Sequence, residues 1–278
     1  MTYNYNMKVI QSILFILIII IFASCEKVFD YSPYAINFDE ENSNVNSKNM
    51  VKIANQQNND GVITIAFTGD THRSFDEIDE FVNFVNDVNR TKQVDFVIHV
   101  GDIADFGLPK QYLWGNSYLL KLNIPYFVVL GNHDLVSNGG DAFHEMYGQF
   151  DYSFIYDSIK FITINTNSLE FNNNGLVPNI NWLDQQLQPN SSFRKAVVLF
   201  HVAPMHGEFD PNLINDFNQT LTKYNNVLFV AHGHMHDYSV STPYNNGITF
   251  VNVYSVEHRK FNIIEIENDT IAVETYSF

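Results

Sequence analysis

The chain of 278 residues is 45% hydrophobic and 15% aromatic, which is enough apolar material for a well-filled core. Its 31 acidic residues outnumber the 15 basic ones and give a formal net charge of −16. Since a DNA or RNA partner requires clustered Lys and Arg to neutralise phosphates, this charge argues against nucleic-acid binding. The composition predicts a folded globular protein without a basic groove.

The N-terminus has the pattern of an export signal. Lys8 precedes an apolar run over residues 9–22, which is shorter than the roughly 20 residues that a membrane-spanning helix needs. Small residues before Cys25 are typical of a cleavage site. We therefore expect residues 1–24 to be a signal peptide. Met7, directly before Lys8, is an alternative translation start.

The segment Phe22-Ala23-Ser24-Cys25 resembles the lipobox of bacterial lipoproteins, in which the Cys is acylated and becomes the mature N-terminus. The resemblance implies an exported protein that is anchored to a bacterial cell-envelope membrane through a lipid on Cys25, with the periplasmic or surface face left open. The alternative is an ordinary secretory signal that ends near a Cys. Because Cys25 is the only cysteine, disulfides and cysteine-based catalysis are excluded from the mature domain.

Residues 25–60 are rich in Asn, Ser and acidic side chains, with aromatic islands at residues 29–34 and 36–38. This composition predicts a lipid-anchored tether that partly packs on the domain and contains a short helix near residues 48–54. The domain proper is expected over residues 61–278.

The first half of the domain alternates apolar strands with helices. The strands are expected over residues 62–67, 94–100 and 126–130. After the first strand, Ser74 and Glu77 form a capping-box signature that begins a helix. After the second, Pro109 can open a helix that ends near Leu122. This βαβαβ order predicts a parallel sheet.

The second half is richer in strands. They are predicted over residues 152–156, 161–165, 196–200, 227–230, 248–253, 261–266 and 271–276. Further helices are predicted over residues 141–147, 180–187 and 213–224. One α/β domain with two sheets is the simplest account of this pattern.

Five apolar strands run directly into carboxylate, imidazole or amide side chains. In an open α/β sheet, the ends of the strands are where sites form. Such oxygens and nitrogens suit hard cations, zinc, iron and manganese. The candidate metal ligands are Asp70, His72, Asp102, Asn132, His201, His234 and His236. Seven are too many for one site with an open position, but they suit two metal ions that share a carboxylate.

Each part of this pattern is weak by itself. Gly131-Asn132-His133-Asp134 alone could be a turn, and a lone His at a strand end, such as His201, is commonly a core residue. The joint occurrence of these residues in order, each at a strand end, is what favours a metal site.

The chain resembles the calcineurin-like metallophosphoesterases over about residues 62–237. The motifs that carry the resemblance are Asp70-x-His72, Gly101-Asp102-x-x-Asp105, Gly131-Asn132-His133-Asp134, the lone His201 and Gly233-His234-x-His236. The resemblance implies a β-sandwich flanked by helices, with a dinuclear centre at the strand ends. It implies three ligand sets: Asp70, His72 and His236 for one metal, Asn132, His201 and His234 for the other, and Asp102 as the bridge. The identity of the metals is left open among manganese, iron, zinc and similar ions.

The family also implies catalytic roles. A hydroxide that bridges the metals would attack phosphorus, His133 would protonate the leaving oxygen, and Asp105 would orient His133. Purple acid phosphatases have an iron-binding Tyr at the position of Asp105, and Ser/Thr protein phosphatases have Arg at the position of Phe106. Neither subfamily therefore fits well.

The remaining histidines receive simpler interpretations. His206 lies five residues after His201 in an expected site loop, and it is a candidate for contact with substrate. His99 is expected in the core, His144 and His258 at the surface or in structural roles, and His232 beside the site without a role.

The leading hypothesis is a membrane-tethered, metal-dependent hydrolase of phosphate esters, with monoesters and diesters both open. A nuclease of the same family is an alternative that the acidic charge disfavours. A second alternative is a catalytically inactive binding lipoprotein that uses the same fold. The complete ligand set argues against it, because a binding module has no need for a costly cluster of like charges. No protein partner is predicted.

Overall fold

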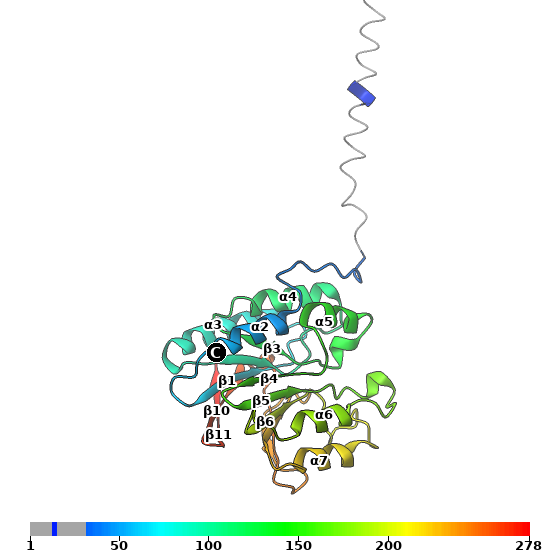
Figure 1. Cartoon of the computed structure of the whole chain (residues 1–278). Coiled ribbons are helices and arrows are strands. Elements are labelled where there is room, and N and C mark those ends of the chain that lie inside the picture. Colours follow the sequence, from blue (N-terminus) through cyan, green and yellow to red (C-terminus); the bar gives the residue numbers. More distant parts are fainter. Residues whose placement is uncertain (1–12, 16–31) are drawn as a thin grey trace, which may run out of the picture. The chain divides into compact units, whose positions relative to one another are not determined.

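A computed structural model describes residues 13–15 and 32–278 of the chain, and residues 36–278 form one compact unit (Figure 1). Cys25 and most of the predicted signal peptide lie outside the described residues. Within the described ranges, no helix combines the length and the apolar character that crossing a membrane requires.

The first sheet has five strands in the order β11-β10-β1-β2-β3. They are β11 (Thr270–Ser277), β10 (Lys260–Glu267), β1 (Ile63–Thr68), β2 (Phe96–His99) and β3 (Tyr126–Val128). β1, β2 and β3 are parallel to one another, which confirms the βαβαβ prediction. β10 pairs antiparallel with β1, and β11 pairs antiparallel with β10.

The second sheet has six strands in the order β4-β5-β6-β7-β9-β8. They are β4 (Tyr152–Tyr156), β5 (Ile159–Thr163), β6 (Lys195–Leu199), β7 (Val227–His232), β9 (Thr249–Asn252) and β8 (Ser239–Ser241). The four central strands are parallel, and the two edge strands are antiparallel. The sequence pattern did not predict β8, because its three residues are all exposed and show no apolar alternation.

The main core lies between the two sheets. Side chains alternate along β1, so that Ile65 and Phe67 belong to the cluster between the sheets and Ala66 to the cluster under the helices. Phe127 of β3 stacks on Phe154 of β4 with 3.9 Å between ring centroids, which joins the two sheets directly. Each such buried side chain stabilises the fold by about 1.5–3 kcal/mol relative to exposure.

Helices cover the outer face of each sheet, as Figure 1 shows. The first sheet carries α3 (Phe75–Lys92), α4 (Pro109–Leu119) and α5 (Gly139–Tyr147), and the second carries α6 (Ile180–Leu187) and α7 (Ile214–Thr222). Three 3-10 turns complete the domain: η2 (His133–Leu135), η3 (Leu169–Phe171) and η4 (Val256–His258). The predicted two-sheet β-sandwich flanked by helices is therefore confirmed.

The capping box predicted at Ser74 is wrong. The Ser74 side chain makes no cap hydrogen bond to α3. Its backbone instead closes a turn, because its N–H donates to the carbonyl of Thr71 at 2.7 Å. That turn gives Ser74 a ψ of 59°, outside the extended region that an N-cap residue usually adopts.

The helix predicted near residues 48–54 is α2 (Val45–Ala54), and it covers the free edge of β3. The Asn46 side chain accepts from the Val128 N–H at 3.0 Å and donates to the Val128 carbonyl at 3.1 Å. Asn49 donates to the carbonyl of Tyr126 at 2.8 Å. The buried side-chain amides of Asn46 and Asn49 thus bind the backbone groups at the edge of β3 that a further strand would otherwise pair with.

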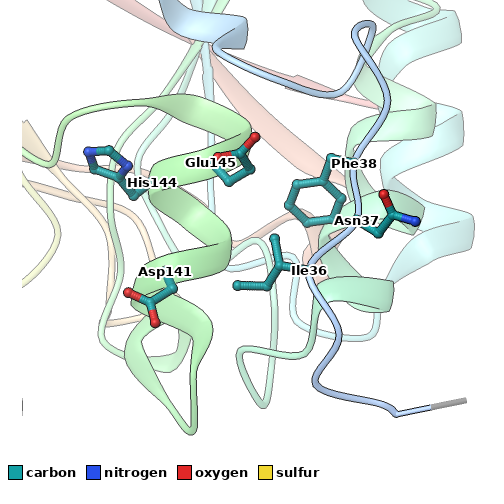
Figure 2. A pocket seen from close by; sticks show the side chains of 6 residues that line it. All are labelled: Ile36, Asn37, Phe38, Asp141, His144 and Glu145. Atoms are coloured by element: carbon teal, nitrogen blue, oxygen red, sulfur yellow. The ribbon is translucent and has the colours of Figure 1, made fainter. Parts of the chain in front are cut away.

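The segment before α2 also packs on the domain. Ile36 and Phe38 line a groove of about 530 Å³. Figure 2 shows both side chains facing α5, which carries Asp141 and Glu145 on the opposite wall. Ile36 and Phe38 contact the core cluster under the helices. Part of the predicted tether therefore belongs to the compact unit.

Candidate metal centre

The predicted ligands meet where strands of both sheets end. Asp70 and His72 follow β1, Asp102 follows β2, and Asn132 comes shortly after β3. The second sheet supplies His201 after β6 and the pair His234 and His236 after β7. The structure brings all seven residues together, and groups of their ligand atoms lie within 4.8 Å of one another.

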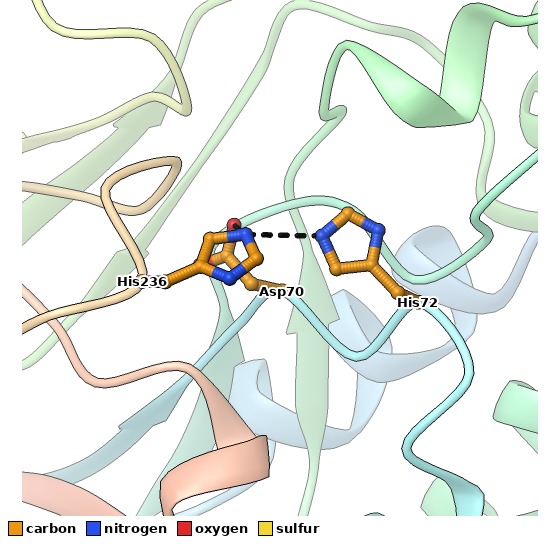
Figure 3. A group of neighbouring side chains, drawn as sticks. All are labelled: Asp70, His72 and His236. Atoms are coloured by element: carbon orange, nitrogen blue, oxygen red, sulfur yellow. Dashed lines mark hydrogen bonds and ion pairs between the residues drawn. The ribbon is translucent and has the colours of Figure 1, made fainter.

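One group consists of Asp70, His72 and His236, whose side chains turn toward one another in Figure 3. Nε2 of His72 lies 3.2 Å from Nε2 of His236, and Nε2 of His236 lies 3.6 Å from Oδ1 of Asp70. Oδ2 of Asp70 is buried and has no hydrogen-bond partner among the described residues. Converging imidazoles beside a buried carboxylate oxygen are a donor set that fits a metal ion.

A second group consists of Asn132, His201 and His234. Oδ1 of Asn132 lies 3.1 Å from Nδ1 of His234. Nδ1 of His201 donates to the carbonyl of Val100 at 2.8 Å, which fixes the ring and directs Nε2 into the site. An amide oxygen and two imidazole nitrogens are also a donor set that suits a transition metal.

Asp102 lies between these two groups and is buried. Its Oδ2 is 3.6 Å from Nε2 of His72 and 3.1 Å from Nε2 of His201. Its Oδ1 accepts from the backbone N–H of His133 at 2.9 Å. One carboxylate therefore contacts an imidazole of each group, while a hydrogen bond holds its other oxygen.

The backbone of the site is strained. Asp70, His72, Asp102, His234 and His236 all have a positive φ, between 49° and 73°. A left-handed conformation costs a residue other than glycine roughly 1–2 kcal/mol, so a cluster of them needs support from its surroundings. Such strain gathers at functional sites, where it directs side chains that a relaxed strand end would point elsewhere.

Asp134 connects the loops that carry the ligands. Its buried carboxylate accepts from the backbone N–H groups of Asp102, Ala104 and Gly131, each at 2.9 Å. Gly131 allows the two loops to approach, because a Cβ there would lie 2.0 Å from Oδ1 of Asp102. Burial and then the charge of Asp102 raise the pKa of Asp134 to about 7. The sequence motif included Asp134 but gave no indication of this bracing role.

The electrostatics of the site favour a positive charge at its centre. Burial raises the pKa of Asp70 to about 6. Burial also acts to raise the pKa of Asp102, but the charge and hydrogen bond of His201, together with the charges of His72 and His133, outweigh burial and lower that pKa. Burial acts to lower the pKa of His201, but Asp102, Asp70 and the hydrogen bond to the Val100 carbonyl together outweigh burial and raise that pKa to about 10. A positive charge beside Asp102 therefore stabilises its carboxylate, and in the chain alone the protonated imidazole of His201 supplies that charge.

His133 lies at the rim of the site in η2. Its Nδ1 donates to the backbone carbonyl of Asp105 at 2.9 Å and is 3.3 Å from Oδ1 of the same residue. The Asp105 carboxylate is itself held by Nε of Arg73 at 2.8 Å. Burial acts to lower the pKa of His133, but Asp102 and then Asp105 outweigh it and raise that pKa. With 42% of its side chain exposed, His133 can meet a bound molecule.

Three contacts to the ligands were missed or only partly anticipated by the sequence interpretation. Oε1 of Glu257 in η4 is 3.0 Å from Nδ1 of His236. Nε2 of His234 is 3.1 Å from Nδ1 of His206 and 3.6 Å from Oε2 of Glu208. Neither glutamate belongs to a motif, so no sequence signal could have indicated it. Such partners commonly fix the orientation of metal-binding imidazoles.

Comparison with known proteins gives the family. The family model described as calcineurin-like phosphoesterase matches residues 63–238. A probable glycerophosphodiester phosphodiesterase, GpdQ, of Arcobacter nitrofigilis is 29% identical over 180 residues, which are 59% of this chain and 64% of that protein. The match therefore spans less than two thirds of the relative.

Two solved structures share the fold. A dimetal phosphatase from Danio rerio has a TM-score of 0.62 at 16% identity, over 78% of this chain and 97% of that one. GAP50, described as the anchor in the inner membrane complex of Plasmodium, has a TM-score of 0.59 at 16% identity, over 78% and 84% of the two chains. The family implies divalent metal ions, and the clustered His and Asp side chains could bind them. Because the family model matches more than half of the chain, the protein belongs to the calcineurin-like phosphoesterase family.

Proposed function

We propose that the protein hydrolyses phosphate esters at a centre of two metal ions. The ligands are assigned as three sets: Asp70, His72 and His236 for one ion, Asn132, His201 and His234 for the other, and Asp102 for both. The observation that carries this proposal is the contact of one Asp102 oxygen with His72 at 3.6 Å and with His201 at 3.1 Å. A single ion would leave one of these imidazoles without a role.

Two bound metal ions would supply positive charge for the phosphate oxygens and lower the pKa of a water molecule toward neutrality. The chain supplies the rest of the chemistry. Asn132 adds a neutral donor, so a third carboxylate does not crowd the site. The imidazole of His201 is buried together with the carboxylates of Asp70 and Asp102. Asp134 holds the ligand loops in place through three backbone hydrogen bonds.

His133 is proposed as the general acid that protonates the leaving oxygen. Its Nδ1–H is committed to the Asp105 carbonyl, so Nε2 is the nitrogen that would deliver a proton. The raised pKa of His133, which Asp102 and Asp105 cause against the effect of burial, favours the protonated form that an acid requires. Asp105 is proposed as the residue that orients the ring of His133. Arg73 neutralises the charge of the Asp105 carboxylate.

Phosphodiesters are the proposed substrate class. The relative from Arcobacter nitrofigilis is named a probable glycerophosphodiester phosphodiesterase, and its likeness to this chain supports a diester over a monoester. A nuclease is disfavoured by the net charge of −16, which would repel a polyanionic substrate. An inactive binding protein is disfavoured by the placement of His133, since a scaffold needs no proton donor beside the ligands.

The proposal is tested by hydrolysis of bis-p-nitrophenyl phosphate and p-nitrophenyl phosphate by the metal-loaded protein. We expect turnover of both, with a higher kcat/KM for the diester, and loss of both activities with chelator. Turnover that survives complete metal removal would contradict the metal mechanism. Absence of turnover after loading with manganese, iron or zinc would favour the binding protein.

We further propose that the mature protein begins at Cys25 and is held to a membrane by a lipid on this residue. The apolar run over residues 9–22 and the lipobox-like segment before Cys25 support this. Intact-mass analysis of membrane-extracted protein tests it. We expect an acylated chain that starts at Cys25, and release of the Cys25→Ser protein from the membrane. An unmodified chain that retains earlier residues would contradict it.

A further inference from the structure

A cavity of about 510 Å³ lies beside the metal-ligand cluster. The loop after β7 builds both, since His234 and His236 belong to the cluster whereas Met235, Asp237 and Tyr238 line the cavity. His206 also lines the cavity. A molecule bound at the cluster would therefore lie next to this cavity.

The imidazole of His206 lies between the cavity and the metal-ligand cluster. Nδ1 of His206 lies 3.1 Å from Nε2 of His234, and the two ring centroids are 4.3 Å apart. His133 lies beside the other ligand group, with its ring centroid 4.6 Å from that of His72. The proton donor and the cavity are thus next to different ligand groups. A leaving alcohol belongs at the His133 end, and the ester group that stays on phosphorus belongs at the cavity end.

The walls of the cavity define what it can bind. Met205 and Met235 give it polarizable apolar surface, and Tyr238 gives it an aromatic ring. Both methionine side chains are about half exposed, so this apolar surface is open to a ligand. Among the described residues that line the cavity, Asp237 is the one carboxylate and none is Lys or Arg. An anionic group would be repelled there, whereas a cation would gain from the carboxylate and the aromatic ring.

We propose that this cavity binds the retained ester group of a phosphodiester, and that the preferred group is a small alcohol with a positive charge. The inference rests on the proposed phosphodiesterase function and deepens it. An uncharged group of the same shape would bind more weakly, and an anionic one would be rejected. A phosphomonoester has no second ester group that could enter the cavity, so it lacks this contribution to binding.

The test uses four diesters that share p-nitrophenol as the leaving group, so the chemical step is held constant. The other ester group is choline, its uncharged isostere 3,3-dimethylbutanol, a carboxyalkyl alcohol of similar length, or methanol as the reference. We expect kcat/KM to fall in the order choline, dimethylbutyl, methyl, carboxyalkyl, with roughly tenfold or more between the first and the last. Equal values for all four would overturn the inference and leave the proposed function standing. Absence of hydrolysis of all four by the metal-loaded protein would overturn both.

Two variants locate the effect. Asp237→Asn should remove most of the preference for choline over dimethylbutyl, because the two groups differ only in charge. Ser241→Trp should fill the cavity from β8 and lower kcat/KM for the choline ester about tenfold relative to the methyl ester. The matched control is Val240→Trp, the neighbouring residue of β8, which is half exposed and does not line the cavity. An equal change in Val240→Trp and Ser241→Trp would overturn the inference.

Discussion

Asp102 and His201 form a buried pair, with Oδ2 of the carboxylate 3.1 Å from Nε2 of the imidazole. The same oxygen also reaches His72. We predict that Asp102→Asn lowers activity more than any change at a ligand of one metal, because it removes a charge that both ions share. Asp70→Asn is the matched comparison, since it makes the same chemical change at a terminal carboxylate. Metal analysis and kcat/KM of the two proteins check this, and near-normal turnover of Asp102→Asn with two tightly bound ions would refute the shared role.

His133→Ala should retain both metals and lose about 10²–10⁴-fold in rate on esters with poor leaving groups, as expected for a positioned acid. The loss should shrink for p-nitrophenyl esters, because p-nitrophenolate departs without needing a proton. Asp105→Asn should show the same dependence more weakly, since it loosens the ring without removing it. Rates on paired activated and alkyl diesters provide the measurement. Equal losses on both types would mean that His133 is not the acid.

Glu257→Gln should weaken metal binding by roughly tenfold while the fold is kept. The carboxylate of Glu257 holds Nδ1 of His236 at 3.0 Å, and an amide would hold it less strongly and without charge. Metal titration of the chelated protein measures the change. Glu145→Gln on the exposed surface of α5 is the control and should leave affinity unchanged. If both variants bind metal like the parent protein, Glu257 does not position His236.

Asp151 should make stability depend on pH. Burial raises its pKa to about 6, although its carboxylate accepts from the Asn165 N–H at 2.7 Å. The Asp151 carboxyl therefore binds its proton more tightly in the folded state than in the unfolded state. As a result, the free energy of unfolding falls as pH rises from about 4 through 6. Asp151→Asn cannot ionise and should be more stable than the parent at pH 7 by on the order of 1–2 kcal/mol. The gain should fade near pH 4.

Urea unfolding of the two proteins with chelator present, between pH 4 and pH 8, measures this difference without the contribution of metal binding. A difference in stability that is the same at every pH would mean that Asp151 does not titrate in this range.

Apolar runs made most of the strands predictable from the sequence, because a strand that is buried along its whole length, such as Ile63–Thr68, is rich in apolar side chains. The candidate ligands were predictable because each follows such a run. Glu257 was not, because a contact between distant segments leaves no periodic signal. The capping box at Ser74 failed because the turn of the site loop determined its backbone. The edge cover by Asn46 was missed, since buried asparagines in a helix look like polar surface.

The most direct test of the two-metal account is a titration of the chelated protein with manganese or zinc, in which bound metal and diester hydrolysis are followed together. We predict two ions per chain at saturation and activity that appears only as the second ion binds, because Asp102 and the imidazoles on both sides of it would act as one unit. Asp102→Asn should bind both ions more weakly. Full activity with one ion per chain, or saturation at a single ion, would contradict the account.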